Sequence, residues 1–390
     1  MLIGGVVGTV GLVMQKWASY NDIARNWHYY TIGYSIAMCS LNLVFSSMIG
    51  LIPDKIPTRQ LGKANGIQAF LCVGGSLCGF AYFFFYLDER VEGMYNFFIA
   101  VMIITVSMTV VFIDEEDPLN LSSDRENDSH KDDENGNNSD GWNENGNNSD
   151  GWNDRNRSLI PALEYREIKS AYYLSPSNPA QHDFFYVTLS RGFYYMGISA
   201  QTFFLYYLKD IIRYPDPQRG TALLAAVAQF CASLSCYPIG IVIDAVMSSP
   251  TFKTTPHRLQ PMKHLVYVAC GLLAAGEMSL VFVRDMDSVI FICCATGIAN
   301  GAYLTLDSSL AVDTLPDKRE SAKYLGIWGV AVFVGTAAGP VITGPLLYLF
   351  GDDGTGRGVY TITGYAVLLG ISSFYFVLSG ASLYKVKATV

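Results

Sequence analysis

Charged side chains are scarce in this sequence, and their scarcity excludes several classes of protein. Only 15% of the 390 residues are Asp, Glu, Lys or Arg, against roughly 25% in an ordinary soluble domain. Long apolar runs take their place, and each approaches the roughly 20 residues that a bilayer core requires of a helix. This composition excludes a soluble enzyme, a nucleic-acid-binding protein and a small disulfide scaffold. It predicts an all-α membrane protein that crosses the bilayer several times.

Residues that carry chemistry are also few. None of the five His residues lies in the middle of an apolar run, so a buried histidine proton relay is not expected. All eight Cys residues lie within apolar runs, where we expect them to be small buried side chains. No nucleophile–base signature, phosphate-binding loop or zinc spacing occurs in the sequence. We therefore expect neither an enzyme nor a protein that binds a cofactor or a metal.

The net charge of −8 comes from a single segment. Residues 114–183 hold 17 of the 34 acidic residues and 6 of the 26 basic ones, and the decapeptide ENGNNSDGWN occurs twice within them. Such an acidic, Asn-rich tract has almost nothing to bury, so we expect a disordered linker. A tail that binds a partner is the alternative.

Ten apolar runs are candidate membrane spans. We expect helices, because a span must satisfy its own backbone hydrogen bonds in lipid. The linker divides them into a partial N-terminal half, residues 1–113, with four helices, and a C-terminal half, residues 184–390, with six. The runs are 1–18, 29–52, 64–87, 94–113, 184–208, 220–247, 264–283, 288–312, 322–350 and 359–384.

Glycines lie inside two of the predicted spans. Gly74, Gly75 and Gly79 belong to the third span, and Gly335 and Gly339 belong to the ninth. Small residues let two helix backbones approach closely in a bilayer. We therefore expect these glycines at helix–helix contacts.

Two loops, one in each half, have related sequences. DKIPTRQLGKANG begins at Asp54 and DTLPDKRESAKYLG begins at Asp313; each has a Pro three residues later and a basic residue two further on, Arg59 or Lys318. Internal repeats of this kind are a mark of secondary transporters. If the halves are equivalent, the two loops should lie on one side of the membrane.

The repeat also predicts how many helices each half should contain. Four candidate spans lie between the linker and Asp313, but only two precede Asp54. The uncharged part of the first run, residues 1–15, would form a helix of about 22 Å, which is shorter than the bilayer core of about 30 Å. We therefore expect a chain that lacks two N-terminal helices.

Two helical halves joined by a long central loop resemble the major facilitator superfamily of transporters. The last two of the stretches that carry the match are similar to the branch that includes glycoside and sucrose transporters. The stretches are LIPDKIPTRQLGKANG at 51–66, FFLYYLKDII at 203–212, GIVID at 240–244 and LDSSLAVDTLPDKRESAKYLGIW at 306–328. The resemblance implies a two-half helical bundle that moves a small solute across the membrane.

The stretch GIVID at 240–244 resembles a degenerate copy of the superfamily's G-x-x-x-D-R/K loop. Gly240 and Asp244 are present, but Ala245 stands where the basic residue is expected. The corresponding loop of the first half is absent, as the missing helices require.

Ionisable residues inside spans are costly and mark functional sites. Arg191 lies about two turns into the fifth span, and Asp307 lies six residues before Asp313 in the eighth. If the two spans run in opposite directions, both charges lie about 9–10 Å deep and at one level. They are either a gate or solute site, or a buried pair that only holds the second half together.

Each of the two charges has polar neighbours on its own helix face. The resemblance implies that these two helices line the central cavity. The neighbours are Tyr195 and Ser199 beside Arg191, and Asn300 and Tyr303 beside Asp307.

Other polar residues lie within apolar runs. Ser35 and Asn42 belong to a polar stripe along the second span, which predicts either hydrogen bonds between packed helices or a wall of a wet cavity. Glu277 lies in the middle of the seventh span. The resemblance places that helix at the periphery, so we expect Glu277 to have a packing or paired role.

The basic residues predict an orientation. With the linker on the cytosolic side, the short loops and tail on that side hold 11 basic residues against 8 on the other, as the positive-inside rule requires. Five N-x-S/T sequons in the linker would then be unused, whereas an external linker would allow their glycosylation.

The sequence as a whole predicts a secondary transporter that carries a small polar organic solute, which includes a sugar-like one, by alternating access. The predicted partners are the solute and the lipid bilayer. No sodium cage is visible, so we expect protons as the coupling ion, with Asp307 as their carrier. The alternative is a non-transporting membrane scaffold or receptor-like relic that lost two helices.

Overall fold

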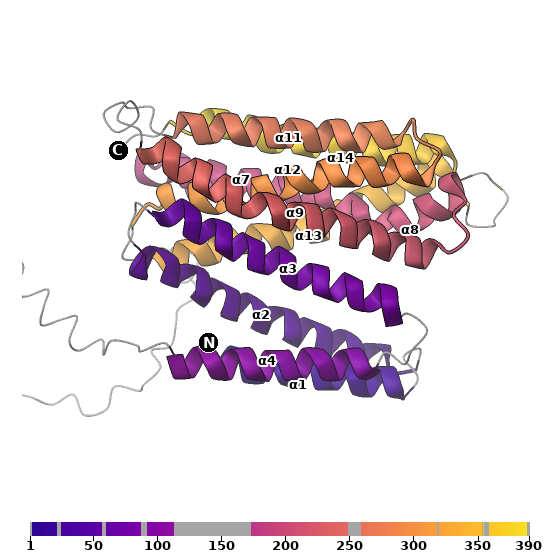
Figure 1. The fold of residues 1–390 in the computed structure, drawn as a ribbon, viewed down its shortest axis with the longest axis horizontal. Helices are drawn as coiled ribbons and strands as arrows, with labels where there is room; N and C mark the ends of the chain where they lie inside the picture. The colour runs from indigo at the N-terminus through magenta and orange to yellow at the C-terminus, as the bar shows by residue number, and fades with distance from the viewer. Residues whose placement is uncertain are drawn as a thin grey trace, which may run out of the picture.

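The computed structural model describes residues 2–21, 25–56, 60–86, 92–112, 173–248, 259–317, 320–352, 354 and 359–387. These residues form ten long helices, one for each predicted span, which confirms the all-helical fold (Figure 1). They are α1 (Leu2–Tyr20), α2 (Trp27–Lys55), α3 (Leu61–Tyr86), α4 (Glu92–Phe112), α7 (Pro179–Ile198), α9 (Pro217–Ser248), α11 (Gln260–Leu280), α12 (Met286–Asp313), α13 (Ser321–Gly351) and α14 (Ile362–Ser382).

The fifth predicted span is not one uninterrupted helix. Helix α7 is followed by a 3-10 turn at Ser199–Phe203, a single α turn at Phe204–Tyr207 (α8) and a π turn at Leu208–Ile212. Arg213, in the left-handed conformation with φ of 56°, ends this series. The prediction of one regular helix over 184–208 was therefore wrong at its C-terminal third.

Successive helices run in opposite directions, so their connections alternate between the two ends of the bundle (Figure 1). We call the end at which α4 stops and α7 starts the linker end, and the opposite end the far end. Helices α2 and α12, which precede the two related loops, both finish at the linker end, and Asn65 Nδ2 of α3 donates to Ser309 Oγ of α12 there at 3.1 Å. Arg59, Lys318 and residues 114–172 of the linker lie outside the described residues.

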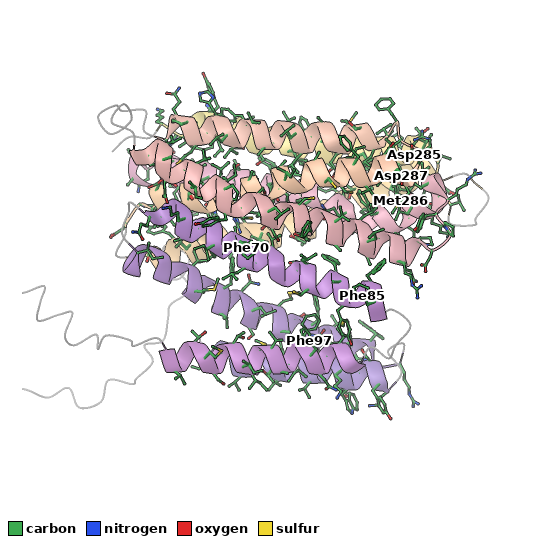
Figure 2. The ribbon with its side chains drawn as sticks, viewed as in Figure 1. Phe70, Phe85, Phe97, Asp285, Met286 and Asp287 are labelled. Atoms are coloured by element: carbon green, nitrogen blue, oxygen red, sulfur yellow. The ribbon has the colours of Figure 1, made fainter. Side chains whose placement is uncertain are left out.

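Apolar side chains on the outside of the bundle fit a lipid environment. Five helices, α3, α9, α12, α13 and α14, are long and apolar enough to cross a membrane, and α4 contains a shorter apolar stretch. Figure 2 shows Phe70 and Phe85 on α3, and Phe85 is 74% exposed. At the far end, the carboxylate of Asp285 accepts from the Ser288 N–H at 2.8 Å and caps α12. The arrangement is that of an integral, multi-pass membrane protein.

The largest buried cluster consists mainly of residues from the helices after the linker, with Ile49 of α2 and Leu61 of α3. Phe184, Tyr194, Tyr303, Trp328 and Phe376 form the centre of this cluster, which joins α7, α12, α13 and α14. Before the linker, α1 packs against both α2 and α4, whereas α3 packs mainly against α9. The helices on the two sides of the linker are joined by α3, which contacts α9 and α12, and by α2, which contacts α13.

Glycines allow two of these helix pairs to approach backbone to backbone. A Cβ at Gly335 would lie 2.5 Å from the carbonyl oxygen of Gly192, so the close helix–helix contact predicted for Gly335 is present and joins α13 to α7. A Cβ at Gly240 of α9 would lie 2.6 Å from the carbonyl oxygen of Gly62 at the start of α3. The prediction for Gly74 was wrong, because no atom lies within 4 Å of the position its Cβ would occupy.

The helical period explains which glycines of α3 make contacts. Gly62, Gly66, Ala69 and Val73 recur every three or four residues and face α9. Gly74 and Gly75 fall outside this stripe, and both have open space where a Cβ would be. The contact face of α3 is therefore set by the first glycine of the helix and not by the glycine pair in its middle.

The crowded backbone at Gly240 and the open space at Gly74 predict opposite effects on stability when each glycine is replaced by alanine. Gly240→Ala should lower the thermal unfolding temperature in lipid nanodiscs, because overpacking a close contact costs about 1–3 kcal/mol. Gly74→Ala is the matched control, and it should leave that temperature unchanged or raise it, because Ala favours a helix by about 0.8–1.0 kcal/mol over Gly. Equal effects of the two substitutions would argue against the α3–α9 contact.

Candidate substrate cavity

The two charges singled out in the sequence form an ion pair. Arg191 of α7 and Asp307 of α12 are each only 3% exposed, and Arg191 Nη1 donates to Asp307 Oδ2. The guanidinium also lies over the ring of Trp328 on α13, with Cζ 3.4 Å from the ring centroid, and 5.2 Å from that of Tyr195. Both ring faces attract a cation. The pair therefore connects three helices.

Aromatic and hydroxyl groups pack behind this ion pair. The rings of Tyr194 and Tyr303 are stacked, with centroids 3.8 Å apart. The Tyr303 hydroxyl lies 3.5 Å from Ser190 Oγ and 3.3 Å from Ser379 Oγ, and these two serines are 3.0 Å apart. Tyr194 donates to Asn300 Oδ1. This network fixes α7 against α12 and α14.

A cavity of about 260 Å³ opens in front of the pair, between α3 and the helices after the linker. Its polar lining consists mostly of neutral amide and hydroxyl side chains, and Arg191 is the one charged residue among the described ones that line it. The lining residues are Phe45, Gln68, Ala69, Cys72, Val73, Ser76, Arg191, Tyr194, Tyr195, Ile198, Gln201, Gln229, Asn300, Leu304 and Ser308.

The predicted site residues of the fifth and eighth spans fall into two groups, those that line the cavity and those that are buried away from it. Arg191, Tyr195 and Asn300 line the cavity. Tyr303 and Asp307 are fully packed behind it. Ser199 is buried against α13, and its hydroxyl donates to the Met196 carbonyl oxygen at 2.6 Å.

The polar stripe of α2 does not reach the cavity. Ser35 Oγ donates to the Thr31 carbonyl oxygen at 2.9 Å, and Asn42 Nδ2 donates to the Met38 carbonyl oxygen at 2.9 Å. These bonds lie within the helix, because such short side chains can turn back to the carbonyl one turn earlier. Among the described side chains of α2, Phe45 lines the cavity.

The irregular end of the fifth span lies beside the cavity. Ser372 Oγ of α14 donates to the Gly197 carbonyl oxygen at 2.7 Å, and Thr202 Oγ1 donates to the Ser199 carbonyl oxygen at 2.8 Å. These hydroxyls compete for carbonyls that a regular helix would use, and such insertions bend helices. The 3-10 turn brings Gln201 into the lining. Broken helices are common at transporter sites.

Asp244, from the predicted loop motif, closes the linker end. Its two carboxylate oxygens accept from the backbone N–H groups of Gly62 at 2.8 Å and Lys63 at 3.0 Å. A carboxylate at a helix N-terminus satisfies free donors and complements the helix dipole. Gly240 lies one turn before it and makes the backbone contact with Gly62. The motif thus joins α9 to α3.

The two related loops begin at the ends of α2 and α12. Asp54 lies in the last turn of α2, and Asp313 is the last residue of α12.

Within the described ranges, no group of three or more His, Cys, Asp or Glu side chains is arranged to hold a metal ion.

The ion pair predicts a characteristic pattern of stability. Arg191→Met or Asp307→Leu alone leaves a buried charge uncompensated and should destabilise the fold by about 3–5 kcal/mol. The double variant should be as stable as the parent or more stable by about 1–4 kcal/mol, because an apolar pair of similar volume carries no desolvation penalty. Denaturant unfolding in detergent measures all three. A double variant as unstable as either single one would contradict the pairing.

Comparisons with known proteins give one curated relative and two solved structures of similar fold. No family model matches the chain. The curated protein MFS transporter L2 of Phoma sp. (strain ATCC 20986 / MF5453) is 26% identical over 115 residues. The match covers 27% of this chain and spans about a fifth, 19%, of that relative.

Two solved structures cover nearly the whole chain. The major facilitator superfamily transporter FucP, in its outward conformation, is 12% identical to this chain with a TM-score of 0.58. The superposition covers 98% of this chain and 81% of the FucP chain. The human organic anion transporter MFSD10 is 13% identical to this chain with a TM-score of 0.65. The superposition covers 97% of this chain and 77% of the MFSD10 chain. The ten-helix bundle described above therefore has the fold of the major facilitator superfamily transporters.

Proposed function

We propose that the chain is a secondary transporter that moves a small polar organic solute across a membrane by alternating access. The observation that carries the proposal is the cavity between α3 and the helices α7, α9 and α12, with the Arg191–Asp307 pair at its wall. Sites of this kind, between the two halves of a helical bundle, bind the solute while the halves rock about it.

The size and lining of the cavity favour a small neutral solute. Its volume of about 260 Å³ lies just below the roughly 300–1,000 Å³ of sites for drug-sized ligands. Gln68, Gln201, Gln229 and Asn300 place amide groups around it, and Tyr195 adds an aromatic ring. Amides both donate and accept hydrogen bonds, as the hydroxyl groups of a sugar do. We therefore propose a sugar-like solute.

An organic anion fits this lining less well. The charge of Arg191, which an anion would need, is already matched by Asp307. An anion would have to displace the carboxylate and leave it buried without a partner, which is costly. The human relative is named as an organic anion transporter, so anions belong in any test of the solute.

The contact between α3 and α9 would act as the gate at the linker end. Backbone contact at Gly62 and Gly240 and the capping bonds of Asp244 hold this end together. If the linker end faces the cytosol, as the basic residues predict, this gate would lie on the cytosolic side of the membrane. Transport then requires the Asp244 bonds to break and re-form in each cycle.

Protons are the proposed driving ion. The sequence hypothesis gave the proton to Asp307, and protonation of that carboxylate would release its ion pair with Arg191. The released guanidinium would still lie against Trp328. Arg191 itself lines the cavity and is therefore placed to contact the solute.

Uptake into proteoliposomes tests the function. We expect the full chain to take up at least one radiolabelled neutral sugar from a panel that also contains nucleosides, amino acids and organic anions. Gln201→Leu should weaken that uptake about two- to twelvefold, which corresponds to one lost hydrogen bond of about 0.5–1.5 kcal/mol. Gln260→Leu, on the exposed start of α11, is the matched control and should transport normally.

The double variant Arg191→Met with Asp307→Leu separates a solute site from a structural pair. We expect it to fold and to show no uptake, because the cavity loses its cationic contact. Normal uptake by the double variant would mean that the pair only stabilises the bundle. Absence of uptake of every panel member by the parent chain would support the non-transporting scaffold instead.

A further inference from the structure

Glu277 is a buried carboxyl group that the site described above does not use. It lies in the middle of α11 and is 6% exposed. Its Oε2 atom has no hydrogen-bond partner among the described residues, and no basic side chain of that part of the chain acts on it. The sequence predicted a packing or paired role for Glu277, and within the described ranges no partner is found for its side chain.

The carboxyl group is connected to the substrate cavity. Glu277 lines a second, smaller cavity of about 80 Å³. Gln201, Gln229 and Asn300 line both cavities and form the wall between them. The remaining lining is almost wholly apolar and includes Leu224, Ala225, Ala228, Leu280, Ile292 and Cys293. A carboxyl group within reach of a polar cavity is therefore surrounded by groups that cannot neutralise it.

Within the part of the chain that the structure describes, the elements packed around Glu277 bring no charge to it. Helix α12 presents the thiol of Cys293, and the end of the fifth span presents the phenol of Tyr207, whose hydroxyl already donates to the Leu280 carbonyl oxygen at 2.8 Å. From α14, Ser373 Oγ donates to the Ala274 carbonyl oxygen at 2.9 Å. Helix α9 and the 3-10 turn contribute neutral amides. The neutral, protonated form of Glu277 is thus the one that this packing accommodates.

We propose that Glu277, rather than Asp307, is the binding site for the proton that drives transport. This inference rests on the proposed transport function. A proton that binds the Glu277 carboxylate gives a neutral carboxylic acid and leaves no other charge exposed. A proton that binds Asp307 would leave the buried guanidinium of Arg191 without its counter-ion.

The two cavities suggest how the proton and the solute are coupled. Release of the proton leaves a carboxylate, which needs water or amide donors around it. Gln201 and Gln229, which line this second cavity with Glu277, also line the solute cavity. When these amides turn toward an ionised Glu277, they can no longer hydrogen-bond the solute. When a proton neutralises Glu277, the amides become available to the solute again. Binding of the proton and binding of the solute therefore favour each other.

Infrared spectroscopy tests proton binding without knowledge of the solute. The full chain in lipid nanodiscs should show, at neutral pH, the carbonyl band of a neutral carboxylic acid, and this band should disappear as the pH is made strongly alkaline. Glu277→Gln should abolish the band. Glu320→Gln, which alters an exposed carboxylate paired with Lys323, is the matched control and should retain it. If Glu277→Gln folds poorly, Glu277→Leu serves the same purpose.

A spectrum in which Glu277→Gln leaves the parent band unchanged, or a parent spectrum without the band, would overturn the proposal. The coupling is tested with the panel sugar that gives an uptake signal. Glu277→Gln should keep exchange of labelled for unlabelled sugar and lose accumulation driven by a proton gradient. Accumulation that persists would overturn the coupling role. If no sugar is taken up at all, the transport function fails, whereas the infrared result still decides whether Glu277 holds a proton.

Discussion

An arginine can lie in the middle of a membrane bundle only where the surrounding side chains neutralise its charge, and Arg191 meets this condition with three helices. Asp307 supplies the counter-ion, and Trp328 and Tyr195 supply aromatic faces. The stacked Tyr194–Tyr303 pair then packs α7 on α12 at the same level. The position of the cavity follows, because the side of α7 that carries Arg191 faces α3 across an open space.

The two sides of the linker meet through a different kind of contact. Close approach of α3 and α9 requires glycine at Gly62 and Gly240, and Asp244 satisfies the free N–H groups where α3 starts. Beyond this end, Ala69 and Val73 of α3 pack against Ala232 and Cys236 of α9. Opening the linker end would therefore require the Gly62–Gly240 contact and the Asp244 bonds to break, which makes this contact the proposed gate.

Much of this architecture could be predicted from the sequence. Apolar run lengths give the ten helices, and equal depth in antiparallel spans places Arg191 beside Asp307. The break after Ile198 could not be predicted, because it depends on a hydroxyl of Ser372 that is distant in the sequence. The glycine pair of α3 misled the prediction because it lies off the contact stripe. The access of Glu277 to the cavity depends on helix rotation, which apolar composition on all faces of α11 leaves unspecified.

Alternating access is the central claim, and distances across the two ends of the bundle test it most directly. Spin labels at Lys63 and Ala245 would report the linker end, and labels at Phe85 and Gln218 would report the opposite ends of α3 and α9, where all four side chains are exposed. Double electron–electron resonance in nanodiscs should give two distances for each pair, and a change from acidic to alkaline pH should lengthen one pair as it shortens the other. A single distance for each pair that pH leaves unchanged would contradict the account.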